Sequence, residues 1–182
     1  TGTVTAKTGT GDITIGKKIT TGKDVNMTVN SGNILIGETV TAGGNINMTV
    51  DRGSADTDYE GIILVGEEVT AKGDISVAIN KGRVLVGKKV ESTQGSVDIL
   101  SNKGYILIGD NGKDVKTVAA YKNVNLTAGD GVIEIYGKTS TTVGDITVHA
   151  ANKEYVADED GQNIIFDLNG KLAAGQDASL IM

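Results

Sequence analysis

The sequence predicts an all-β fold: a right-handed parallel β-helix (β-solenoid) of about seven coils, each of ~21 residues with three short strands. The first observation is a short apolar phrase bracketed by glycines, which recurs after a basic step of 21 residues, with longer steps where residues are inserted. The second is strict alternation of apolar and polar residues between successive copies of that phrase. The six copies begin at Gly11, Gly32, Gly61, Gly82, Gly104 and Gly131.

The glycine-bracketed phrase is the expected first strand of each coil. Side chains alternate between the two faces of a strand, so every second residue of the phrase points inward. Stacked coils then align these residues in columns, and one such column is Ile13, Ile34, Ile63, Val84, Ile106 and Ile133. Glycines at the corners allow close backbone approach and positive φ where the chain turns.

Two further strands complete each coil. The second is short and begins with charged residues, as at Glu67 and Glu68. The third alternates, and in 25–29 the residues Val25, Met27 and Val29 are expected inside. The stretch 118–121 has some helical character, but its place in the repeat favours a strand.

Composition narrows the function classes. The 182 residues are 38% hydrophobic, with 26 glycines and no cysteine, so disulfides and thiolate chemistry are excluded. A net charge of −6 and no basic stripe argue against nucleic-acid binding. No apolar run approaches ~20 residues, so no membrane span is expected. We expect one solenoid segment over 1–182, cut from a longer protein whose adjacent coils would contact its ends, with regular coils over about 11–150 and a diverged coil over 151–182.

The first strands carry an unusual outward column. If the flanking isoleucines face inward, four leucines must face outward and form an exposed apolar stripe, which typically marks a contact surface. Covering by another part of the same protein, or lateral packing, is an alternative use of this face. The expected contact residues are Leu35, Ile62, Leu64, Arg83, Leu85, Tyr105 and Leu107.

Two acidic insertions, 54–60 with Tyr59 and about 152–160 with Tyr155, enter at the corner between a third strand and the next first strand. Loops on a rigid scaffold often carry binding functions, although tolerated surface insertions explain them equally well. Asp158, Asp160 and Asn163 faintly resemble a calcium loop but miss its spacing, so we expect no metal site and no cofactor. The lone His149 lies outward without a catalytic partner, and paired acids on one face are not visible, so no catalytic residue is expected.

The segments 37–50 (GETVTAGGNINMTV) and 66–79 (GEEVTAKGDISVAI) resemble the filamentous haemagglutinin-like repeats of large bacterial secreted exoproteins, the adhesins of two-partner secretion. The likeness covers roughly 11–150, although the family step is nearer 19 to 20 residues. The resemblance implies a non-catalytic rod at the bacterial cell surface or outside the cell, which displays a distal domain or adheres to a receptor or glycan on a host or neighbouring cell.

Three alternatives stay open. A phage tail fibre or spike segment would use similar coils but should form trimers. A self-polymerising extracellular filament would join coil ends. A polysaccharide-degrading β-helix enzyme would need a cluster of carboxylates on one face.

Overall fold

The computed structural model describes residues 2–51, 60–109 and 116–150, and the backbone of three later strands, 164–166, 171–173 and 178–181; for 116 and 117 it also describes the backbone alone. Within these residues the chain is all-β and contains no helix. The strands fall into three kinds that follow one another in order, and we call each set of three a repeat.

The first strands are β2 (Ile13–Ile15), β5 (Ile34–Ile36), β8 (Gly61–Val65), β15 (Ile133–Ile135) and β18 (Ile164–Phe166). The second strands are β3 (Ile19–Thr21), β6 (Val40–Ala42), β9 (Glu68–Ala71), β11 (Lys89–Ser92), β13 (Lys116–Ala120), β16 (Gly137–Thr141) and β19 (Lys171–Ala173). The third strands are β1 (Val4–Thr10), β4 (Val25–Ser31), β7 (Ile46–Val50), β14 (Val124–Ala128), β17 (Ile146–Ala150) and β20 (Ala178–Ile181). Two longer strands, β10 (Ile75–Val86) and β12 (Val97–Ile108), join a third strand to the first strand of the next repeat.

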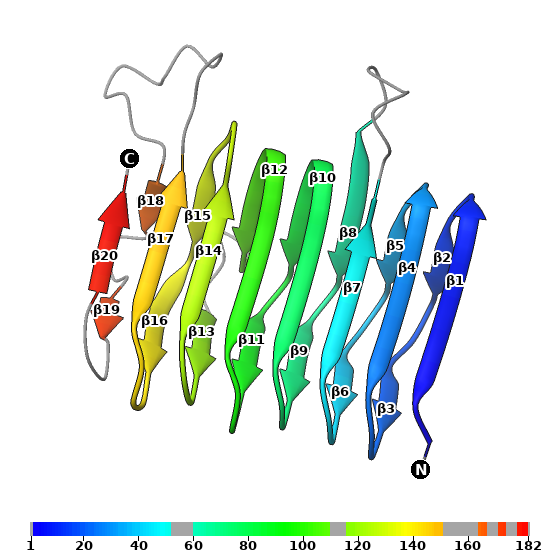
Figure 1. Cartoon of the computed structure of the whole chain (residues 1–182), viewed down its shortest axis with the longest axis horizontal. Coiled ribbons are helices and arrows are strands. Elements are labelled where there is room, and N and C mark those ends of the chain that lie inside the picture. The colour runs from blue at the N-terminus through cyan, green and yellow to red at the C-terminus, as the bar shows by residue number, and fades with distance from the viewer. Residues whose placement is uncertain are drawn as a thin grey trace.

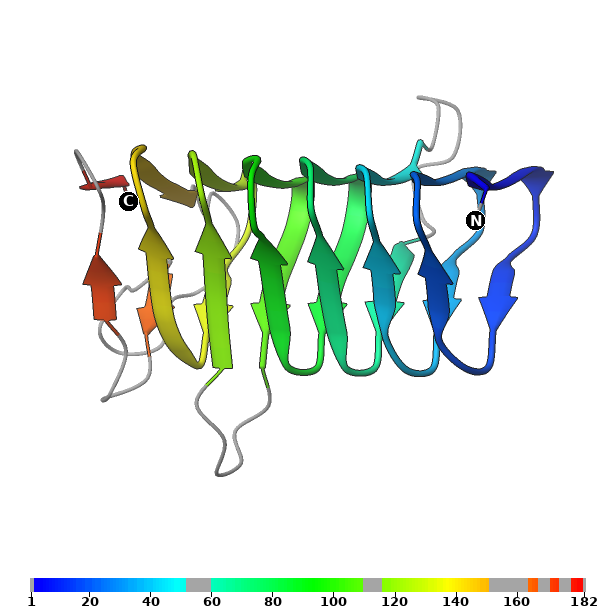
Figure 2. The same cartoon turned by 90° about the horizontal axis from the view of Figure 1, so that it is seen from below.

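All strand pairs are parallel, and each strand pairs with the strand of the same kind one repeat away. Val25, for example, lies between Val4 and Ile46. The described strands form a 13-stranded sheet of first and third strands and a 7-stranded sheet of second strands. Figures 1 and 2 show the repeats side by side along the long axis, with the two ends of the chain at opposite ends of the stack. The prediction of stacked parallel strands is therefore confirmed.

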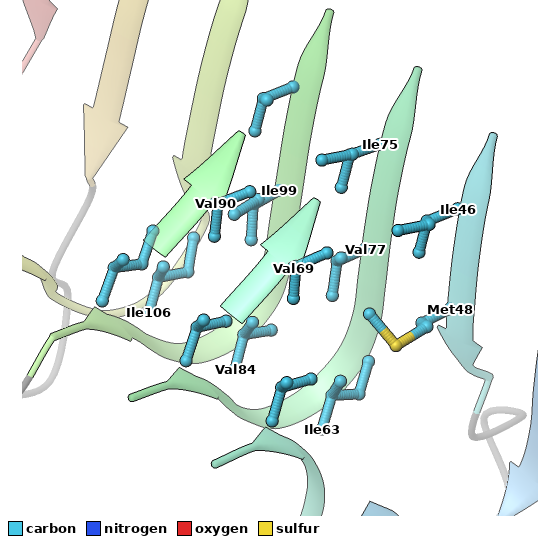
Figure 3. Packing of buried hydrophobic residues seen from close by; sticks show 14 of the residues in the cluster. Ile46, Met48, Ile63, Val69, Ile75, Val77, Val84, Val90, Ile99 and Ile106 are labelled. Atoms are coloured by element: carbon cyan, nitrogen blue, oxygen red, sulfur yellow. The ribbon is translucent and has the colours of Figure 1, made fainter. Parts of the chain in front are cut away.

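The apolar core lies between the sheets and runs along the stack. Figure 3 shows Ile63, Val84 and Ile106 from successive first strands with their side chains turned into this interior, together with residues of the second and third strands. Each of these three side chains is fully buried. Of the predicted column only Ile13, in the first repeat, is half-buried, because no earlier first strand covers it.

Corner glycines let neighbouring repeats approach closely. Gly82 has φ +132°, and a Cβ atom there would overlap the carbonyl oxygen of Gly61 in the preceding repeat. Only a residue without a side chain fits such a position. The expected role of the corner glycines is confirmed at this site.

The register places the extra residues of the longer repeats. Segment 52–59 lies between β7 and β8, and 151–163 between β17 and β18, the corner expected for both insertions. A third insertion was not assigned from the sequence. Val84 pairs with Ile106 but Val90 pairs with Val118, so the extra residues of that repeat lie between β12 and β13. The stretch expected as a strand rather than a helix is β13, which confirms that choice.

Candidate binding face and groove

The outward face of the first strands gathers the expected contact residues in two columns. The register stacks Leu35 on Leu64, Leu64 on Leu85, and Leu85 on Leu107. The neighbouring column stacks Ile62, Arg83 and Tyr105. The structure therefore brings all seven residues onto one face.

The leucine column is less exposed than the sequence suggested. Leu35, Leu64, Leu85 and Leu107 are all half-buried, and within the described residues the exposed large apolar side chains are Tyr121 and Val143, on another part of the molecule. The expectation of an exposed stripe was wrong because each leucine lies one strand spacing, about 4.8 Å, from its neighbour in the column. Side chains of this size cover one another at that spacing.

Part of this face is hollowed into an open groove of about 420 Å³. Its walls come from four successive repeats, because Glu60 precedes β8, Arg83 lies in the second half of β10, Tyr105 and Leu107 lie in β12, and Glu134 lies in β15. Asp130, Val132 and the backbone of Gly104 and Gly131 complete the lining. Strand spacing makes the groove about 14 Å long along the stack.

Arg83 organises the groove. Its guanidinium carbon lies 5.2 Å from the centre of the Tyr105 ring, a cation–π distance. Its Nη2 lies 3.8 Å from Glu60 Oε2, and both side chains are about half exposed (46% and 53%). At the other end of the groove, the Tyr136 hydroxyl donates a 3.3 Å hydrogen bond to Glu134 Oε2. These contacts place an aromatic ring, one guanidinium and two carboxylates along the groove.

The groove carries an excess of negative charge, with three carboxylates (Glu60, Asp130 and Glu134) against one guanidinium. Sequence reasoning had found Arg83, Tyr105 and Leu107 but missed the carboxylates. Aligning the columns would have found them, since Glu134 follows Leu107 in the same column.

Several other candidates lie elsewhere or outside the described residues. Tyr59, Tyr155 and the calcium candidates Asp158, Asp160 and Asn163 all fall outside them. His149 is half-buried at an outward position of β17, beside Thr127 of β14. Across the described ranges, no group of three or more His, Cys, Asp or Glu side chains is placed to hold a metal ion, and no helix is long and apolar enough to cross a membrane.

No family model matches this sequence, no curated protein matches it, and no solved structure matches the chain.

Proposed function

We propose that this chain is a right-handed parallel β-helix that acts as a rod segment of a bacterial surface or secreted filamentous adhesin. In this role it is non-catalytic and works outside the cell. It either attaches to a receptor or glycan on another cell or holds a distal domain away from the surface. The alternating repeats that resemble haemagglutinin-like exoproteins support the extracellular, bacterial part of this proposal.

The observation that carries the proposal is the unbroken register. Parallel pairing continues from Val4 beside Val25 to Val148 beside Leu180. Seven steps of about 4.8 Å give a stack about 34 Å long. Because every backbone ladder runs along the same axis, bending the stack would break many hydrogen bonds together. Such a stack suits a rigid spacer.

The outward first-strand face supports an adhesive contact. Its half-buried leucines form a continuous apolar surface beside a groove with polar groups, which is the composition of many binding surfaces. The rod also repeats this surface along its length, so a partner could touch several repeats at once.

The test measures how well beads coated with the purified chain attach to cells. It compares the wild type with the double variant Leu64→Asp, Leu85→Asp. We expect the variant to stay folded by circular dichroism and to lose most attachment. A matched control, Thr49→Asp with Ala78→Asp, places the same charges on the outward third-strand face and should adhere like the wild type. Equal attachment by both variants would remove the contact role of the leucine face.

A second candidate is hydrolysis of a polysaccharide, because three carboxylates line the groove and glycosidases use a pair of acids. Release of reducing sugar from a polysaccharide panel, abolished by Glu134→Gln, would support this enzyme activity. If the wild-type chain released no reducing sugar from any polysaccharide after prolonged incubation, this enzyme activity would be eliminated.

A further inference from the structure

We propose that the Arg83–Tyr105 groove binds an uncharged oligosaccharide. The inference deepens the proposed adhesive function, because it names the ligand class and the residues that hold it. The rod itself does not depend on this ligand.

The lining has the mixture of groups that a sugar ring requires. Hydroxyl groups both donate and accept hydrogen bonds. The groove offers acceptors at Glu60, Asp130 and Glu134 and donors at Arg83. Charged groups make stronger hydrogen bonds with hydroxyls than neutral groups do. A ring with several hydroxyls can therefore satisfy groups on more than one wall.

The groove also has apolar surface for the carbon face of a sugar. Tyr105, Leu107 and Val132 supply this surface. The guanidinium of Arg83 lies 5.2 Å from the centre of the Tyr105 ring, and this contact favours one position of the ring before the ligand arrives. A surface that is already ordered costs less entropy on binding.

Size and shape favour a chain of sugars over a single small ion. A volume of about 420 Å³ lies in the range of small-molecule sites. The lining residues come from successive repeats, so the groove runs along the stack, as a site for a linear chain of sugars would.

Charge disfavours acidic sugars. Three carboxylates face one guanidinium, and Arg83 is already paired with Glu60. An acidic glycan would therefore meet net repulsion, and like charges across an interface weaken binding. A neutral glycan avoids this cost, and its affinity should depend little on salt.

The experiment is a glycan array probed with the labelled chain, in three groups: neutral, sialylated or uronate-containing, and amino-sugar oligosaccharides. Positive spots are then measured by calorimetry at low and high salt. We expect neutral glycans to bind with an affinity that salt hardly changes. Tyr105→Ala should weaken binding by about tenfold or more, because it removes the central aromatic contact. Tyr121→Ala, the same substitution on a distant exposed tyrosine, should bind like the wild type.

A second variant guards against misfolding. Glu134→Leu gives the column the residue that the four preceding repeats carry, so it should fold, and it should weaken binding by removing one acceptor. No bound neutral glycan, stronger binding of acidic or amino-sugar glycans, or equal binding by wild type and both groove variants would overturn the inference. The bead assay on the leucine face would then still test the adhesive rod independently.

Discussion

The side chain of Asp24 accepts a 2.7 Å hydrogen bond at Oδ1 from the backbone N–H of Asn45, one repeat further along the stack. Asn45 in turn accepts a 2.8 Å bond from the backbone N–H of Asp74, and Asp74 accepts one of 2.8 Å from that of Ser96. The ladder continues through Ser96 and Asn123 to the N–H of Asp145. These residues stand just before the third strands, where a backbone donor would otherwise need water. The Asp, Asn or Ser just before each third strand therefore links neighbouring repeats.

Breaking this ladder should destabilise the stack more than removing an outward amide. Asn45→Ala takes away the acceptor of the Asp74 N–H and should lower the free energy of unfolding by about 1 kcal/mol. Urea denaturation followed by circular dichroism measures the loss. The control is Asn47→Ala, which removes only an exposed side-chain bond to Asn26 (2.8 Å) and should cost about half as much or less. An equal loss in both variants would mean that the ladder has no special role.

The glycine column allows a second matched comparison. Gly16, Gly37, Gly66 and Gly87 occupy the same corner in successive repeats. A Cβ on Gly87 would overlap the carbonyl oxygen of Gly66, whereas a Cβ on Gly16 meets nothing within 4 Å. Gly87→Ala should therefore cost about 3 kcal/mol or more of stability, because the stacked backbones must move apart. Gly16→Ala should change stability by no more than about 0.5 kcal/mol. Thermal unfolding of both variants gives the answer, and similar melting temperatures would contradict close stacking at this corner.

The repeat made most of the fold predictable. The alternation within a single strand such as 46–50 indicates which residues face inward, and the 21-residue step indicates which residues stack on one another. Tyr105 could be placed beside Arg83 for this reason. Residues that depart from the step were harder, since β12 and β13 are separated by an insertion that shifts every later position.

The groove was only half predictable, because it depends on residues that vary within a column. Leu107 continues the column of leucines from the preceding repeats, whereas Glu134 replaces the leucine in the next repeat. Reasoning about a typical repeat passes over such exceptions. The degree of exposure was missed for another reason: how far Leu85 is covered depends on Leu64 and Leu107 on either side, which one strand does not reveal.

Neighbouring residues of β12 should respond differently to truncation. Ile106 is fully buried in the core, and Ile106→Ala should cost about 3 kcal/mol through lost burial and the cavity left behind. Leu107 faces outward and is half-buried, so Leu107→Ala should cost about 1 kcal/mol or less. Denaturant midpoints of the two variants measure the difference. A larger loss at Leu107 would reverse the inward and outward assignment of this strand.

The ion pair between Lys88 and Glu67 should make the free energy of unfolding depend on pH in the acid range. Lys88 Nζ lies 3.1 Å from Glu67 Oε1, and its hydrogen bond and charge, with a further bond from Thr39, hold the pKa of Glu67 below the ordinary 4.5. A carboxyl with a lowered pKa in the folded state stabilises the fold fully above its unfolded pKa. That contribution is lost as the pH falls below 4.5 and through the folded pKa.

Lys88→Met should therefore raise the pKa of Glu67, measured by NMR titration, and flatten the fall in stability below pH 4.5. Lys72→Met, which removes a lysine that is not part of this pair, should leave the Glu67 titration unchanged. High salt should reduce the difference between wild type and Lys88→Met, because both partners are partly exposed. Identical Glu67 titration curves in the wild type and Lys88→Met would show that the ion pair does not form in solution.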